Sequence, residues 1–340
     1  MSGLIEGRAA GRQTSQGWLW GLAGALVVLF GLALLAGRYP TPGLMSLSQL
    51  NGDELAMRLF LNLRLPRLLT AMLLGMSLAS AGLVFQMLFN NPLIEPGFLG
   101  VSQGAAFGAA FCIVFLGSNA LAVQGVAAVF ALVGLMLSYL LARRIRYGGW
   151  VLRLVLAGIA VSALFSSGLG VLKYLADPLT QLPEITFWLL GGLSGIVWAR
   201  FLSILPAVWI GLSVLFLFRW RLNILALSDE AAFSLGTTPR RERLLLLTMA
   251  VLATAAVVSV AGMVGWVGLI VPHLARRMFG ADARLALPAA MLLGGGFSIL
   301  CDTLARTLLS GEIPLGILTA FFGAATFVIL MTSRGFRLER

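Results

Sequence analysis

The chain has 340 residues, of which 59% are hydrophobic and only 11% are charged, and its formal net charge is +11. A typical soluble domain carries about 25% charged residues, so this composition excludes an ordinary soluble protein and favours an integral membrane protein. The arginines lie in short clusters between apolar runs. This distribution argues against a nucleic-acid-binding face and for a charge bias that orients the chain in a bilayer.

Apolar runs long enough to cross about 30 Å of hydrocarbon recur along the chain. The predicted fold class is therefore all-α integral membrane, with about ten transmembrane helices in residues 18–333, flanked by cytoplasmic segments 1–17 and 334–340. We expect helices near residues 18–36, 65–89, 97–117, 119–142, 151–174, 201–218, 244–262, 287–309 and 314–332, with a shorter helix near 266–278.

Arginine clusters predict the topology, because basic loops stay in the cytoplasm. The clusters at 143–146, 219–243, 276–284 and 334–340, together with the N-terminus, are all expected to be cytoplasmic. Two crossings must then fit into residues 244–275, fewer than the about 40 residues that two full helices need. One helix is therefore short or broken, unless the two form a tilted pair in a thinned bilayer.

A faint repeat indicates a two-fold construction. Five residues recur at a constant offset of 180, and the charge-derived topology makes one copy run inward and the other outward, which is an inverted repeat. The first copy is Ala81, Gly82, Val84, Pro92 and Gly100, and the second is Ala261, Gly262, Val264, Pro272 and Gly280. Glycines 100, 104 and 108 share one helix face and predict close helix packing.

The sequence offers no enzyme chemistry. It contains no H-E-x-x-H, no G-x-S-x-G and no P-loop, and its single histidine, His273, has no acidic or thiol neighbour. We therefore expect no catalytic residue, no metal site and no cofactor in this chain, and any ATP and Mg must be handled by a partner. Asp302 and Arg306 lie four residues apart on one predicted helix, so they form either a structural ion pair or a substrate contact.

The polar loop 225–243 is predicted to carry a short cytoplasmic helix, with Ser228 as its N-cap and Gly236 as its stop. Its apolar side has no core in the loop itself, so a protein partner or the membrane surface must cover it. The partner is favoured, because the acids of the first turn would face anionic lipid. The residues concerned are Ser228, Asp229, Glu230, Ala231, Ala232, Phe233, Leu235 and Gly236.

Several motifs occur in order between about residue 55 and residue 332. They are Arg64-Leu-Pro-Arg67, Asn91-Pro92-Leu93, Gly265-Trp-Val-Gly268, Val271-Pro272-His273 and Glu312-Ile-Pro314-Leu-Gly316. Together they resemble the permease subunit of iron-chelate and cobalamin-type ABC importers. Asn90, Ser228 and Ala325 depart from the residues frequent at these positions. The departures leave the resemblance intact and weaken assignment to one substrate subgroup.

The resemblance implies a ten-helix permease in the bacterial inner membrane, paired as a homodimer around a central pathway. Two ATPase subunits, which bind ATP and Mg, and a periplasmic substrate-binding protein would complete the importer. The 228–236 helix then matches the helix that couples to each ATPase. Arg64, Arg67 and Arg306 match arginines that pair with carboxylates of the binding protein, although interface anchoring by snorkelling arginines remains an alternative.

Two further expectations follow. The loop Tyr147-Gly148-Gly149 links an arginine cluster to the helix at 151–174, and its paired glycines permit the backbone change of a gate at the inner end of the pathway. The expected cargo is a ferric siderophore or related iron chelate, with haem, cobalamin or an oxyanion such as molybdate as alternatives. A secondary carrier or channel is the rival class, and the lack of a chain of intramembrane carboxylates or histidines argues against it.

Overall fold

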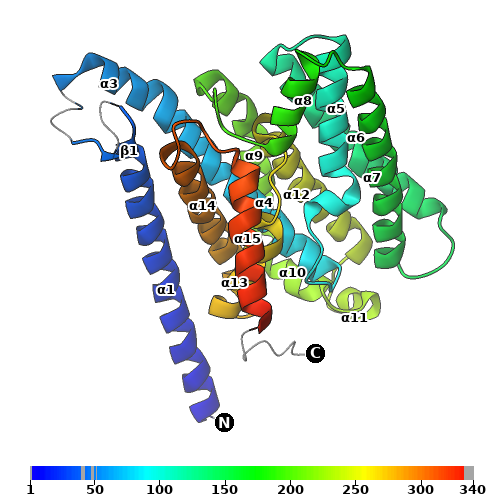
Figure 1. The fold of residues 1–340 in the computed structure, drawn as a ribbon. Helices are drawn as coiled ribbons and strands as arrows, with labels where there is room; N and C mark the ends of the chain where they lie inside the picture. Colours follow the sequence, from blue (N-terminus) through cyan, green and yellow to red (C-terminus); the bar gives the residue numbers. More distant parts are fainter. Residues whose placement is uncertain (1, 40–42, 47–49, 51, 333–340) are drawn as a thin grey trace.

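The computed structural model describes residues 2–39, 43–46, 50 and 52–332, with side chains from residue 17 onward, and it is almost entirely helical (Figure 1). Eight helical segments in this part of the chain are long and apolar enough to cross a membrane. They are residues Gly17–Leu35 of α1 (Ser2–Leu35), the continuous unit of α3 (Glu54–Leu59), η1 (Phe60–Arg64) and α4 (Leu65–Leu88), α6 (Ala120–Arg144), α7 (Trp150–Leu175), α9 (Trp198–Leu217), α12 (Pro239–Ala261), α14 (Ala283–Thr307) and α15 (Leu315–Thr332).

Two further helices of the core are too short to cross alone: the apolar α5 (Val101–Phe115) and the amphipathic α13 (Val267–Phe279). At 1.5 Å per residue they span only about 20 Å of a roughly 30 Å hydrocarbon layer. The expectation of about ten membrane segments is confirmed. The expectation of a full helix at 97–117 is wrong, because η2 (Pro96–Leu99) and Gly100, with φ of +78°, separate the loop after α4 from α5.

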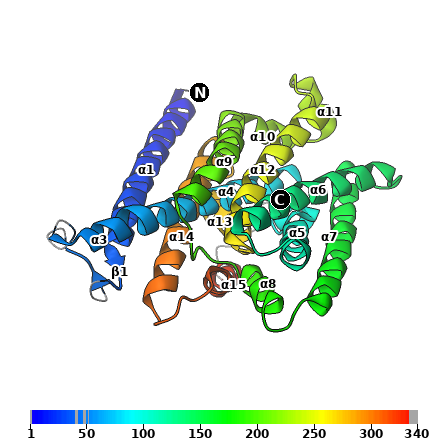
Figure 2. The ribbon, with the colours of Figure 1, turned by 90° about the horizontal axis from the view of Figure 1, so that it is seen from above.

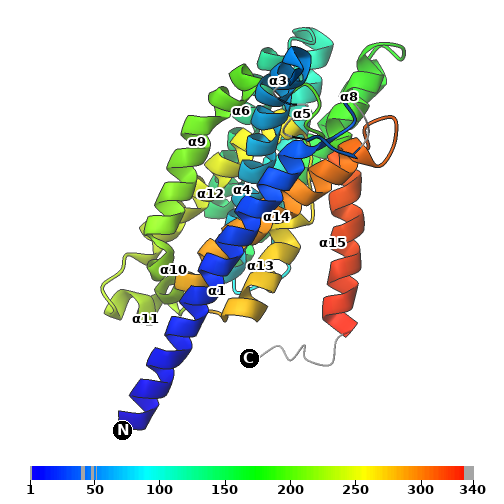
Figure 3. The same ribbon diagram turned by 90° about the vertical axis from the view of Figure 1, so that its left-hand side faces the viewer.

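The remaining helices lie at the two ends of the molecule. Helix α8 (Gln181–Leu190) lies near the end where α3 is found, whereas α10 (Arg219–Leu225) and α11 (Asp229–Ser234) lie at the opposite end (Figures 1 and 3). A short antiparallel pair, β1 (Ala36–Gly37) and β2 (Gly43–Leu44), follows α1. Beside it, the Tyr39 hydroxyl donates to Asp53 at 2.8 Å and holds the pKa of that carboxyl below its usual value.

Helix α4 is the centre of the fold, and α12, α13 and α14 pack around it. Small residues allow this close contact: a Cβ added to Gly75 would lie 1.9 Å from the carbonyl oxygen of Gly294 in α14. The predicted packing face on α5 is also present, since a Cβ on Gly104 would lie 2.4 Å from the carbonyl oxygen of Phe130 in α6. Backbones this close gain dispersion contacts that lipid-facing leucines cannot provide.

A long helix is followed by a short one in both halves of the chain, for example α4 by α5 and α12 by α13. The offset of 180 does not align these elements: Gly82 lies inside α4, whereas Gly262 caps the end of α12, and Pro92 lies in a loop, whereas Pro272 lies inside α13. The five residues of the pattern therefore do not occupy equivalent positions in the two helix pairs.

The termini lie away from this centre. Helix α1 packs along α14, and α15 stands near α8 at the edge of the bundle (Figures 2 and 3). Residues 2–17, predicted as a separate segment, continue the helix of α1, and the predicted tail 334–340 lies outside the described residues.

Candidate functional site

The short helix α11 forms where the sequence predicts it. The Ser228 hydroxyl accepts from the backbone N–H of Ala231 at 3.4 Å, Asp229 and Glu230 occupy the first turn, and Gly236 takes a left-handed φ of +80° just beyond the end. Acids in the first turn interact favourably with the positive end of the helix. Pro239 then begins α12, so α11 is a separate helical turn and not an extension of that span.

The exposed surface of α11 carries two large apolar side chains beside its polar ones. Phe233 is 71% exposed and Leu235 is 59% exposed, whereas Ala232 is fully buried and packs towards the rest of the chain. The carbonyl of Ala232 accepts from the hydroxyl of Thr237 at 2.7 Å. The predicted apolar side is therefore narrower than the sequence indicates: Phe233 and Leu235 face outward, and Ala232 anchors the helix.

Arg243 fastens this loop to α12. Its side chain is 8% exposed, it pairs with the carboxylate of Asp229, and it donates to the carbonyls of Leu225 at 2.8 Å and Leu227 at 3.1 Å. One guanidinium thus binds the last turn of α10, the linker and the first turn of α11. Asn90, after α4, adds a hydrogen bond of 3.0 Å to the carbonyl of Ala226. These bonds join α11 and its linker to α12 and to the turn after α4.

The loop Tyr147-Gly148-Gly149 lies between α6 and α7, with Tyr147 exposed and Gly148 at φ of +77°. Trp150 at the start of α7 stacks on Phe89 with ring centroids 5.8 Å apart, and the Arg243 guanidinium lies 5.9 Å from the Trp150 ring. The predicted gate loop is thus at the same end of the molecule as α11. Its gating role stays a prediction.

The three predicted docking arginines lie together at the opposite end, where they bind groups of this chain. Arg67 donates to Asp302 at 2.9 Å and to Glu312 at 2.7 Å, and Asp302 is fully buried whereas the Glu312 side chain is 46% exposed. The Arg306 Nε lies 3.7 Å from Asp302, so the ion pair expected from the spacing of these two residues is present. A buried carboxylate between two guanidinium groups is strongly stabilised only if both partners stay in place.

The other contacts of this cluster reach the chain around α1. Arg306 donates to the carbonyls of Ala33 and Ala36, and Arg64 donates to those of Leu34 and Tyr39. A cavity of about 440 Å³ opens between these elements, lined by Arg38, Arg64, Arg67, Arg306 and Glu312. These contacts engage all three predicted side chains within the chain. Their docking role stays a prediction.

The comparisons with known proteins decide the family. The sequence signature of the FecCD transport family matches residues 25–333, which is most of the chain. This chain belongs to the FecCD transport family. The FecCD fold is also found in a solved structure, a transporter described as metal-chelate type in an inward-facing conformation, at 35% identity and a TM-score of 0.86, covering 93% of this chain and 99% of that one.

Individual FecCD relatives carry different substrate names. The molybdate import system permease protein MolB of Haemophilus influenzae is 35% identical over 320 residues, covering 92% of this chain and 94% of that protein. The probable iron chelatin transport system permease protein of Helicobacter pylori strain 26695 is 38% identical over 280 residues, covering 82% and 83%. The chain is therefore a multi-pass ABC importer permease, as the sequence motifs predict.

Sequence reasoning missed two parts of this FecCD site. Arg243 serves in the sequence only as a topology marker, because its bonds to α10 and α11 join residues 14 to 18 positions apart and leave no local signal. Glu312 was read only as part of a motif, and its pairing with Arg67 across 245 residues has no local signal.

Proposed function

We propose that this permease moves a ferric siderophore or a related iron chelate from the periplasm to the cytoplasm, driven by separate ATPase subunits. The observation that carries the proposal is the geometry of α11, which displays Phe233 and Leu235 while Arg243 fastens the helix to α12. An apolar surface on a rigidly held helix is suited to transmit force from a partner, whereas a loosely held loop would absorb it.

The partners follow from the same assignment. Each ATPase subunit would receive Phe233 and Leu235 in an apolar groove and would bind the ATP and Mg, while this chain contributes no cofactor. Two copies of the permease would enclose the pathway in the bacterial inner membrane, with both termini in the cytoplasm. The loop Tyr147-Gly148-Gly149 would close the pathway at its cytoplasmic end.

The arginine cluster would receive the periplasmic binding protein. Arg64, Arg67 and Arg306 surround one cavity, and the partly exposed Glu312 already occupies one face of Arg67. A carboxylate of the binding protein would enter this cavity and compete with Glu312 for the guanidinium group. Such pairs steer association and fix orientation more than they add affinity.

The cargo is the part of the proposal that rests on relatives. The iron chelatin relative supports an iron chelate, and the molybdate relative supports an oxyanion as the second candidate. The test is to isolate the binding protein that associates with this permease and to measure its affinity for ferric siderophores, haem, cobalamin and molybdate. We expect tightest binding of a ferric chelate, and selective binding of molybdate would overturn the iron assignment.

A further inference from the structure

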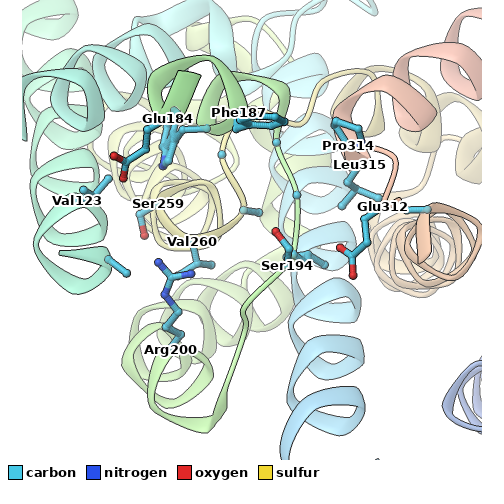
Figure 4. Close-up of a pocket in the computed structure, with 18 of the residues that line it drawn as sticks. Val123, Glu184, Phe187, Ser194, Arg200, Ser259, Val260, Glu312, Pro314 and Leu315 are labelled. Atoms are coloured by element: carbon cyan, nitrogen blue, oxygen red, sulfur yellow. The ribbon is translucent and has the colours of Figure 1, made fainter. Parts of the chain in front are cut away.

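A second cavity lies at the arginine end and adjoins the 440 Å³ cavity, with which it shares Arg67, Leu193 and Glu312. Its volume is about 360 Å³, and its lining includes residues of α8, the loop after α8, the first turn of α9, the end of α12 and the loop before α15 (Figure 4). The charged groups on its wall are Arg67, Glu184, Arg200 and Glu312, and the hydroxyl groups are those of Ser118, Ser194 and Ser259.

Arg200 differs from the other charged groups of this wall. Glu184 accepts from the Ser118 hydroxyl at 2.5 Å, and Arg67 and Glu312 bind each other. Arg200 is half-buried, its guanidinium group points into the cavity, and among the described residues it has no ion pair and no side-chain hydrogen bond (Figure 4). Five N–H donors on a planar, permanently charged group are therefore left to bind something from outside the chain.

We propose that this cavity binds an anionic group of the transported cargo, with Arg200 as the residue that recognises it. A guanidinium group matches the geometry of a carboxylate or a tetrahedral oxyanion and binds it through two parallel hydrogen bonds. The proposal rests on the proposed function, because it takes the ligand to be the cargo of an importer. It deepens that function by naming the chemical class of the cargo group that the permease itself recognises, which is an anion.

The size of the cavity limits the ligand. Small-molecule sites occupy about 300–1,000 Å³, so a 360 Å³ cavity is at the small end of the range. It would hold one carboxylate-bearing arm of a chelate, or a free anion of the size of citrate or molybdate. The hydroxyl of Ser194, which also points into the cavity, would add a donor to the bound oxygen atoms (Figure 4).

The carboxylate opposite Arg200 provides a second test of whether the cavity binds anions. Glu184 lies across the cavity on α8 and would repel a bound anion, although its charge is partly satisfied by Ser118 (Figure 4). Replacing Glu184 by Gln removes that repulsion and keeps a group able to bond Ser118. A cavity that binds anions should therefore bind them more tightly in E184Q and less tightly in R200Q, a pair of opposite effects that a purely structural role for either residue would not produce.

The experiment measures binding of citrate and, separately, molybdate to the full-length permease in lipid nanodiscs by calorimetry, with xylitol as an uncharged control. R200Q should weaken anion binding about 10- to 150-fold, the range for losing a hydrogen bond to a charged group, and R200K should lie between R200Q and the parent. R58Q is the matched control, since Arg58 lies at the same end, is exposed and, in the part of the chain that the structure describes, forms an ion pair with Glu54 alone. It should leave binding unchanged.

The contrary outcomes are distinct. If neither anion shows saturable binding at millimolar concentration, or if R200Q binds as the parent does while both melt at the same temperature, the site is wrong. Failure of the proposed function is measured separately as ATP-driven uptake of a ferric chelate by the parent importer. Arg200-dependent anion binding without chelate uptake would support the anion site and refute the iron-chelate function. Chelate uptake that is unchanged in R200Q would refute the role of Arg200 in recognising the cargo and would leave the iron-chelate function in place.

Discussion

Arg243 and Asp229 form an ion pair across the boundary between α11 and α12, and the same guanidinium group binds the carbonyls of Leu225 and Leu227. The pair is asymmetric, because the Arg243 side chain is almost fully buried whereas that of Asp229 is largely exposed. The buried partner therefore dominates the cost of disruption, since the buried carbonyl of Leu225 would lose both hydrogen bonds that Arg243 donates to it.

Arg243→Ala should uncouple the importer without preventing its assembly. Hydrogen bonds to a charged group contribute about 1.5–3 kcal/mol each, so their loss should loosen α11 while leaving Phe233 and Leu235 exposed. We expect co-purification with the ATPase to persist and ATP-driven uptake to fall steeply. D229N should be milder, because Asp229 is largely solvated. Uptake equal to that of the parent in R243A would show that α11 needs no such attachment.

The apolar surface of α11 should be the contact with the ATPase. Replacing Phe233 and Leu235 together by Asp would place two unpaired charges in a buried groove, which costs several kcal/mol. We expect this double variant to lose the ATPase during affinity purification. L179D is the control, since Leu179 is highly exposed and lies in the loop between α7 and α8 at the other end of the molecule. Retention of the ATPase by the double variant would contradict the coupling role.

Replacing Arg64, Arg67 and Arg306 together by Glu should slow association with the binding protein, most clearly at low salt, because steering by surface charge weakens as salt screens it. Association rates at low and high salt, measured by surface plasmon resonance, check this expectation. The same substitutions remove internal bonds, so the thermal unfolding of each protein must be recorded. D302N, which disturbs the cluster without reversing its charge, serves as the control. Equal association rates for the parent and the triple variant at low salt would make the cluster purely structural.

The loop Tyr147-Gly148-Gly149 should approach its copy in the paired permease when the pathway closes. Cys112 and Cys301 are both buried, so replacing them by Ala gives a background in which a cysteine at position 148 is the only thiol. We expect crosslinking between two copies to differ between the ATP-bound and nucleotide-free importer. Equal yields in both states would identify the loop as a rigid connector.

Local signals in the sequence predict much of this fold. Ser228, Gly236 and Pro239 define α11 because capping and helix termination depend on adjacent residues. The same logic fails at α5, where Gly100 interrupts an apolar run that hydropathy reads as one helix. It also misses that α3, η1 and α4 form one continuous helical segment. In the sequence alone, the polar residues of the π-helical turn Phe60–Arg64 resemble the start of a new helix.

Long-range pairing sets the limit of prediction at the site. The spacing of Asp302 and Arg306 predicts their contact, since four residues bring side chains to one helix face. Nothing local indicates that Arg67 joins them or that Glu312 completes the cluster. The open guanidinium group of Arg200 is equally invisible in the sequence, because the cavity that it faces is built from helices far apart along the chain.

The most direct test of ATP-driven import uses proteoliposomes that contain this permease and its ATPase, with a ferric chelate supplied on its binding protein. The account predicts accumulation of iron that requires both ATP hydrolysis and the ATPase, and that is lost when Phe233 and Leu235 are replaced by Asp. Accumulation by the permease alone, driven by an ion gradient or by the chelate gradient, would contradict the account and make the protein a carrier or channel.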